Sequence, residues 1–263
     1  MGVVLGIAPI FAPILGSHLH IWFGWQSNFV FVAAYGALVC VLAARALPET
    51  LARPDRRALD PRRIASNFLM LARTRDFAGY SLVAAFATAG LFAFLSGSAF
   101  VFVGVMNSGE TGFGLLFAMV MTGNISGALI ASRLVVRMGI DGLLRRSTLL
   151  LLVSSLVLAA LAWLRVDHPA AVVAPMFFYM LAFTASMPQA SAGALSPHPG
   201  IAGAASSLLA FAQFAIAAVA GLLVGLTFDG TQRPMASVIA LFAVLAFITF
   251  RRLRPARHAQ GRA

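Results

Sequence analysis

Residues Phe211 to Gly225 read FAQFAIAAVAGLLVG, and this stretch decides the fold class. It carries no charged side chain, and its apolar residues do not alternate with polar ones. A membrane β-barrel needs that alternation, because successive strand residues face the lumen and the lipid in turn. An α-helix satisfies its backbone hydrogen bonds internally, so an uninterrupted apolar run favours a membrane-spanning helix.

Similar apolar runs recur along the chain, each close to the length of about 20 residues that crosses a ~30 Å hydrocarbon core. The eight expected membrane helices are residues 2–22, 27–47, 77–106, 113–136, 147–164, 170–195, 201–228 and 235–250. Of the 263 residues, 60% are hydrophobic and 10% charged, and the mean hydropathy is +0.92. A soluble globule cannot hide so many apolar side chains. We predict an all-α, polytopic membrane protein embedded in a lipid bilayer.

The distribution of arginine predicts how these helices are oriented. Seventeen of the 19 arginines fall on one side of the eight-helix scheme, and only Arg165 and Arg233 fall on the other. Cytoplasmic loops of membrane proteins retain positive charge. Both chain ends are therefore expected in the cytoplasm. The formal charge of +11 is explained by these loops, so we expect no nucleic-acid partner.

The longest hydrophilic stretch, residues 48–76, divides the chain into unequal parts. It contains Pro54 and Pro61 among acidic and basic residues, which predicts a basic cytoplasmic linker. Residues 1–47 would then be the last two helices of one bundle, 77–250 a six-helix bundle and 251–263 a basic cytoplasmic tail. Six helices resemble one half of a pseudo-symmetric transporter. Because Met1 opens directly into an apolar run, we expect an N-terminal truncation that removes four helices.

Proline and small residues recur at close spacing in the first and seventh expected helices. Proline bends a helix, and small residues let a neighbouring helix approach closely. We expect these positions to form packing faces on which the two helices move against each other. The residues concerned are Pro9, Pro13, Gly16, Gly203, Gly221 and Gly225.

Six short motifs follow one another along nearly the whole chain. They are residues 12–17 (APILGS), 24–29 (GWQSNF), 47–51 (LPETL), 113–118 (FGLLFA), 188–190 (PQA) and 202–207 (AGAASS). In this order they resemble the bicyclomycin and chloramphenicol resistance (Bcr/CflA) drug exporters of the major facilitator superfamily. The first is similar to that family's antiporter motif, with Ala12 and Ser17 in place of two glycines. The second has Gln26 where the family usually has arginine.

This resemblance implies two bundles of about six helices each, with a cavity between them at the membrane midplane. It also implies export of small drug-like compounds by proton antiport in a bacterial inner membrane, and the present chain would hold helices five to twelve. An exporter of a natural metabolite, such as a nucleoside, sugar or amino-acid derivative, is an alternative. A polytopic lipid-modifying enzyme is a further alternative, although it would require His, Asp or Glu clustered at one membrane face.

Polar and aromatic side chains inside the apolar runs are the candidates for lining a substrate cavity. Three of them lie four residues apart on one helix face, where aromatic rings and a hydroxyl suit flat amphipathic compounds. The others are amides and a hydroxyl that are costly in lipid unless they face a cavity or a neighbouring helix. The candidates are Phe92, Ser96, Phe100, Asn124, Tyr179, Gln189 and Gln213. Packing against lipid or other helices, and interhelical hydrogen bonds, are the alternatives.

Chemistry of other kinds finds little support in the sequence. The single Cys40 and the scattered histidines give no metal-binding pattern, and no catalytic cluster or cofactor motif is present. All eight carboxylates map to expected loops or membrane edges. Proton coupling normally needs a titratable group within the membrane, so protons are expected to act through the missing N-terminal half. Residues 133–146 resemble a degenerate copy of the superfamily's basic loop motif, or are simply positive-inside charge.

Overall fold

A computed structural model describes residues 15–16, 18–19, 21–46 and 60–253. Throughout these ranges the regular structure is helical, which confirms the all-α class. Among these described residues, six helices are long and apolar enough to cross a membrane, and the longest of them covers two of the expected runs. The protein is therefore an integral membrane protein.

The helices follow the expected order. Their bounds are α2 (Gln26–Ala46), α3 (Pro61–Arg73), α4 (Arg75–Ala99), the π-helix η2 (Phe100–Val105), α5 (Gly109–Trp163), α6 (Ala170–Leu195), the 3-10 helix η3 (Pro199–Ile201), α7 (Ala202–Thr227) and α8 (Arg233–Arg252). The second to eighth expected runs all fall on these helices. Most of the first run, including Pro9 and Pro13, lies outside the described residues.

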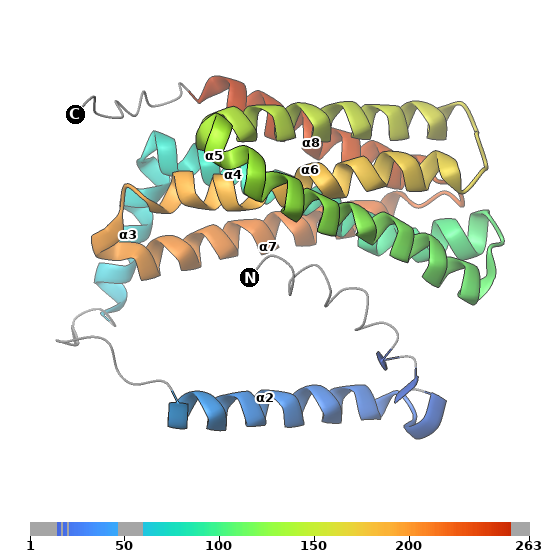
Figure 1. The fold of residues 1–263 in the computed structure, drawn as a ribbon, viewed down its shortest axis with the longest axis horizontal. Coiled ribbons are helices and arrows are strands. Elements are labelled where there is room, and N and C mark those ends of the chain that lie inside the picture. The colour runs from blue at the N-terminus through green and yellow to red at the C-terminus, as the bar shows by residue number, and fades with distance from the viewer. Residues whose placement is uncertain (1–14, 17, 20, 47–59, 254–263) are drawn as a thin grey trace.

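The prediction of a loop between the fourth and fifth runs is wrong. Residues 133–146 are helical on both sides of a single break at Gly139, where φ is 69° and ψ is 175°. Only glycine adopts this conformation without strain, because a Cβ would clash with the backbone. One residue therefore reverses the chain, and α5 forms two arms that run back along each other (Figure 1). We call residues 109–138 its first arm and 140–163 its second arm.

The hydrophilic segment predicted as a linker also contains a helix, α3. Asp60 caps its start by accepting a hydrogen bond from the Arg62 amide at 3.0 Å, and Pro61 occupies the first turn, where its missing N–H is not needed. A helix of 13 residues is marginal by itself. Leu71, which is fully buried against α4 and its neighbours, supplies about 1.5–3 kcal/mol of burial energy. Whether residues 48–76 connect two bundles stays a prediction.

Contacts at the two ends of the bundle show which helix ends lie together. At one end Arg75 Nη2 donates to the Arg252 carbonyl at 3.0 Å, and the Tyr80 hydroxyl donates to Asp141 at 2.5 Å. At the other end Gln232 Nε2 donates to the Val166 carbonyl at 3.1 Å. We call the first the arginine end and the second the far end. Successive helices run between them in alternate directions (Figure 1).

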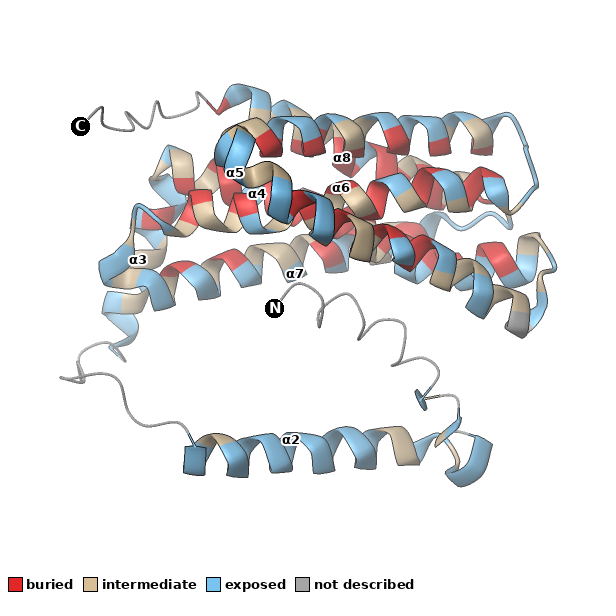
Figure 2. Ribbon diagram, in the orientation of Figure 1, coloured by how far each residue is buried: buried red, intermediate tan, exposed pale blue. Residues whose placement is uncertain are grey.

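Small residues let α4 occupy the centre of the bundle. Its inward positions include five alanines with no exposed surface, Ala84, Ala85, Ala87, Ala89 and Ala93. They allow α6, α7 and α8 to pack closely around it, while α5 covers α6 and α8. Buried positions lie on the faces that these helices turn toward one another (Figure 2).

Helix α2 differs from the rest because it buries no residue. Its side chains are almost entirely apolar, yet Figures 1 and 2 show it apart from the other helices and exposed on every side. Phe29 and Tyr35, for example, are both more than half exposed. Its whole surface is left for lipid or for other protein.

Candidate functional site

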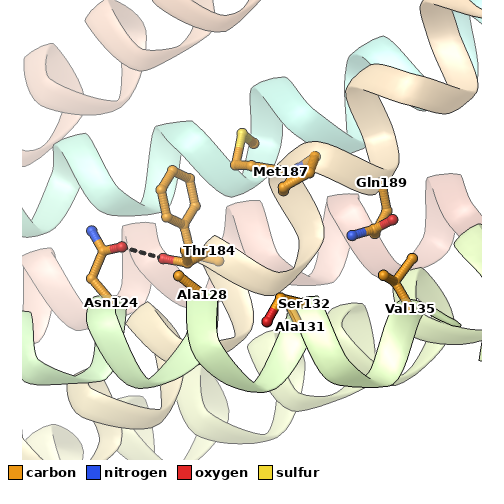
Figure 3. A pocket seen from close by; sticks show the side chains of 10 residues that line it. Asn124, Ala128, Ala131, Ser132, Val135, Thr184, Met187 and Gln189 are labelled. Atoms are coloured by element: carbon orange, nitrogen blue, oxygen red, sulfur yellow. Dashed lines mark hydrogen bonds between the residues drawn. The ribbon is translucent and has the colours of Figure 1, made fainter. Parts of the chain in front are cut away.

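A cavity of about 500 Å³ lies between the first arm of α5 and α6 (Figure 3). Its lining is mostly apolar, with a few amides and hydroxyls among aliphatic, aromatic and thioether groups. The lining residues are Asn124, Ala128, Ala131, Ser132, Val135, Phe183, Thr184, Met187, Pro188 and Gln189. Two of the predicted cavity residues, Asn124 and Gln189, are therefore brought together here.

A hydrogen bond across the two helices fixes one side of this cavity. The Thr184 hydroxyl approaches Asn124 Oδ1 at 2.5 Å and also lies 3.0 Å from the Met180 carbonyl (Figure 3). In an apolar surrounding, a polar side chain held by a partner is far less costly than one left unpaired. The pair therefore keeps an amide and a hydroxyl at the cavity wall.

Two glycines that the sequence analysis did not single out make this geometry possible. A Cβ at Gly123 or Gly127 would overlap the backbone carbonyl oxygens of Phe177 and Leu181, respectively. The backbones of α5 and α6 thus touch on either side of Asn124. The signal was present, because Gly123 and Gly127 have the small-x-x-x-small spacing of close helix pairs.

Gln189 and Pro188 shape the part of the cavity nearer the arginine end. Only 6% of Gln189 is exposed, and within the described segments its amide makes no side-chain hydrogen bond. Pro188 lacks an N–H, so it cannot close the helical hydrogen bond to the carbonyl of Thr184. The Gln189 amide and the Thr184 carbonyl are therefore polar groups that lie beside apolar walls. A bound molecule with hydrogen-bonding groups can satisfy them.

The lining contains no ionisable side chain. Its chemistry is that of small-molecule sites in general, in which a few polar groups orient a ligand that is otherwise held by apolar contacts. Phe183 and Met187 offer a flat ring and a polarizable thioether. The arrangement suits a small, amphipathic, uncharged compound.

Tyr179 lies elsewhere, although it shares a helix with Gln189. It is fully buried, and its hydroxyl donates to the Ala87 carbonyl of α4 at 2.9 Å. The ring fits only because residue 90 is glycine, since a Cβ there would overlap the phenol. This bond is an interhelical hydrogen bond, which was the alternative to substrate contact for this residue.

Phe92 and Ser96 on α4 and Phe100 at the start of η2 do share one side, and that side faces α7. Phe92 packs edge-on against Phe214 at a ring separation of 6.0 Å, and Phe100 packs against Phe228 at 5.3 Å. Between them, Ser96 Oγ lies 2.9 Å from where a Cβ of residue 221 would be. These three residues form a contact with α7 that is separate from the cavity. Their contact with substrate stays a prediction.

The remaining candidates lie apart from the cavity. Gln213 is half-buried on α7. Of the three predicted glycines on α7, only Gly221 is closely packed, because a Cβ at Gly203 or Gly225 would meet nothing within 4 Å. A Cβ at Gly16 would lie 3.5 Å from Asn28 Oδ1 and touch no α7 atom within 4 Å. Movement of the first and seventh helices against each other stays a prediction.

The carboxylates that the structure describes lie at helix ends or between helices. Asp60 caps α3, Asp76 is in the first turn of α4, and Asp141 follows the break in α5. Asp167 and Asp229 lie in loops at the far end. The Thr231 hydroxyl donates to Asp229 at 2.6 Å and holds the pKa of that carboxyl below its usual range.

These features define an α-helical membrane protein with a largely apolar cavity, carrying a few polar groups, between spanning helices, which is the architecture of a transporter. The chain belongs to the Major Facilitator Superfamily, whose family profile matches residues 1–222.

Similar proteins extend the comparison. The chain is 30% identical over 248 residues to a bicyclomycin resistance protein homolog of Haemophilus influenzae, covering 94% of this chain and 62% of that protein. It is 24% identical to a chloramphenicol resistance protein of Pseudomonas aeruginosa, covering 79% and 48%. It is 26% identical to multidrug resistance protein D of Escherichia coli, covering 80% and 51%. The chain thus spans less than two thirds of the length of these relatives.

The comparisons confirm the resemblance to bicyclomycin and chloramphenicol resistance proteins that the ordered motifs predicted. Superfamily membership and the relatives' names also indicate a transporter, rather than the lipid-modifying enzyme considered as an alternative.

Proposed function

We propose that the cavity between α5 and α6 forms part of the substrate site of an exporter of small drug-like compounds. The observation that carries this proposal is a largely apolar cavity of about 500 Å³ with the Asn124–Thr184 pair at one end and the Gln189 amide, which has no hydrogen-bond partner among the described residues, at the other (Figure 3). Relatives named for resistance to bicyclomycin, chloramphenicol and multiple drugs support it. Chloramphenicol is a suitable first probe, because it is uncharged and carries several hydrogen-bonding groups.

The complete transporter is proposed to work by proton antiport in the bacterial inner membrane, with both ends of this chain in the cytoplasm. The arginine distribution supports the orientation. Proton coupling is assigned to a part of the transporter other than these helices, because the described carboxylates lie at helix ends and not at mid-membrane. Arginine cannot serve, since a guanidinium group does not release its proton in proteins.

The proposal is tested by binding of radiolabelled chloramphenicol to the purified 263-residue chain in a scintillation proximity assay. Thr184→Val keeps the shape of the side chain but removes the hydroxyl, and Asn124→Ala removes its partner. A hydrogen bond is worth about 1 kcal/mol, so each change should weaken binding by about fivefold. Combining them should cost little more, because both remove the same interaction.

The matched control is Thr122→Val on the same arm of α5. Thr122 is exposed and its hydroxyl bonds only to the Met119 carbonyl of its own helix. This variant should bind as the wild type does. Equal affinities for Thr184→Val, Asn124→Ala and Thr122→Val would remove the cavity from the proposed site.

A further inference from the structure

A second cavity, of about 600 Å³, lies at the break in α5. Arg137 and Met138 line it from the end of the first arm, and Arg145 and Arg146 line it from the start of the second. The reversal at Gly139 is what brings these residues to one hollow, since the two arms fold back along each other (Figure 1). We call it the arginine hollow.

The arginine hollow keeps its positive charge. Within the described residues, Arg137, Arg145 and Arg146 form no salt bridge, and the guanidinium of Arg146 contacts only the thioether of Met138, which is a weak acceptor. Asp141, the acid nearest in sequence, instead accepts a hydrogen bond from Tyr80 of α4. Three exposed guanidinium groups therefore retain donors in a geometry that matches phosphate oxygens.

An apolar track leads away from the hollow along the second arm of α5. Leu149 lines the hollow itself, and Val153, Leu156 and Val157 follow at the spacing of one helix face. All four are close to half exposed. Val153 and Val157 also line an apolar groove of about 300 Å³ between this arm and α6. Val153 in this groove lies about 6 Å along the helix from Leu149, given a rise of about 1.5 Å per residue.

We propose that the arginine hollow binds the phosphate headgroup of an anionic phospholipid, with one acyl chain in the groove between α5 and α6. The charge alone would also suit free phosphate. The continuous apolar track favours a lipid, because it places a hydrocarbon surface where an acyl chain would leave the headgroup. A basic pocket beside membrane helices on the positively charged side is a typical place for such a lipid.

The test measures lipid binding to the full 263-residue chain in detergent by native mass spectrometry, with phosphatidylglycerol, phosphatidylcholine and inorganic phosphate as separate probes. Phosphatidylglycerol is expected to bind at least about tenfold more tightly than phosphatidylcholine. Replacing Arg137, Arg145 and Arg146 together by glutamine should remove that preference. Arg145→Lys keeps the charge but loses the planar fork, so it should weaken binding by a smaller factor.

The matched control replaces Arg62, Arg73 and Arg252 by glutamine, which removes the same charge from the same end of the bundle. It should leave the preference for phosphatidylglycerol within about twofold of the wild type. An equal loss of the preference for phosphatidylglycerol in both triple variants would overturn the proposal. It would indicate a general electrostatic attraction of the lipid to the arginine end. Inorganic phosphate that competes fully with phosphatidylglycerol would assign the hollow to a free anion.

The acyl-chain part of the proposal has its own variant. Val153→Ser with Val157→Ser makes the groove polar and leaves the arginines in place. It should weaken phosphatidylglycerol binding and not change any weak binding of inorganic phosphate. Unchanged affinity for the lipid would show that the groove is not part of the site. Circular dichroism of each variant, compared with the wild type, identifies any that fail to fold.

Discussion

At the scale of single residues, Asn124 and Tyr179 present the same sequence signal, a polar side chain within an apolar run, yet they lie in different surroundings. Tyr179 points at Gly90, where the missing Cβ leaves room for the phenol, and its hydroxyl reaches a buried carbonyl of α4. Asn124 instead faces Thr184 across a cavity. The residue opposite each side chain decides between packing and exposure to a ligand, and no pattern within one helix reveals that residue.

The different position of Tyr179 leads to a prediction. Tyr179→Phe removes the hydrogen bond to Ala87 but keeps the ring, so it should cost about 1 kcal/mol of stability. This corresponds to a fall of about 2–4 °C in Tm for a domain of this size. Chloramphenicol affinity should not change. The control is Tyr35→Phe on exposed α2, which should leave Tm unaltered. A loss of affinity larger than the loss of stability would return Tyr179 to the substrate site.

At the scale of helices, the contact of α5 with α6 depends on Gly123 and Gly127. Gly127→Ala would place a methyl group against the carbonyl of Leu181, so the two backbones must separate. Overpacking of this kind costs about 1–3 kcal/mol. We expect a lower Tm and weaker chloramphenicol binding, because the shift also separates Asn124 from Thr184. Gly114→Ala on the same arm is the control, since a Cβ there meets nothing within 4 Å.

Helix lengths could be predicted from the sequence because an apolar run has to match the membrane thickness. The second to eighth expected runs all coincide with helices. The helical conformation of residues 133–146 on both sides of Gly139 could not be predicted in this way, because charged residues around a glycine look like a loop. Helix α3 was missed for a related reason: Ile64, Phe68 and Leu71 make only a narrow apolar face within a polar segment. Contacts between helices, such as Gly123 with Phe177, depend on tertiary packing.

At the scale of the whole molecule, the exposure of α2 is consistent with the greater length of the relatives. This helix buries nothing against α3–α8, and the chain covers 62% of the bicyclomycin resistance protein homolog. In a two-bundle transporter, a substrate site at the midplane has walls from both bundles. The cavity between α5 and α6 is lined by these two helices of one bundle, as expected for one wall of such a site. Ligand binding, and not transport, is therefore the measurement that reports on this wall.

The orientation of the bundle gives the last prediction. Contacts such as Arg75 with Arg252 and Tyr80 with Asp141 place the start of α4, the break in α5 and the end of α8 at one end. Gln232 and Val166 meet at the other end. The helices therefore alternate in direction, although these contacts do not tell which end faces the cytoplasm. We predict that the arginine end faces the cytoplasm, because moving guanidinium groups across a bilayer is costly and cytoplasmic loops retain them.

Green fluorescent protein fused after Arg146 should therefore fluoresce, and alkaline phosphatase fused there should be inactive. Fusions after Gly109 or Asp229, at the far end, should give the opposite pattern, because alkaline phosphatase folds only outside the cytoplasm. Replacing Arg137, Arg145 and Arg146 by glutamine tests the physical cause. Fourteen arginines of the arginine side remain in that variant against two on the other, so the orientation should persist. Active phosphatase after Arg146 in the unmodified chain would reverse the assignment and place the arginine hollow in the outer leaflet.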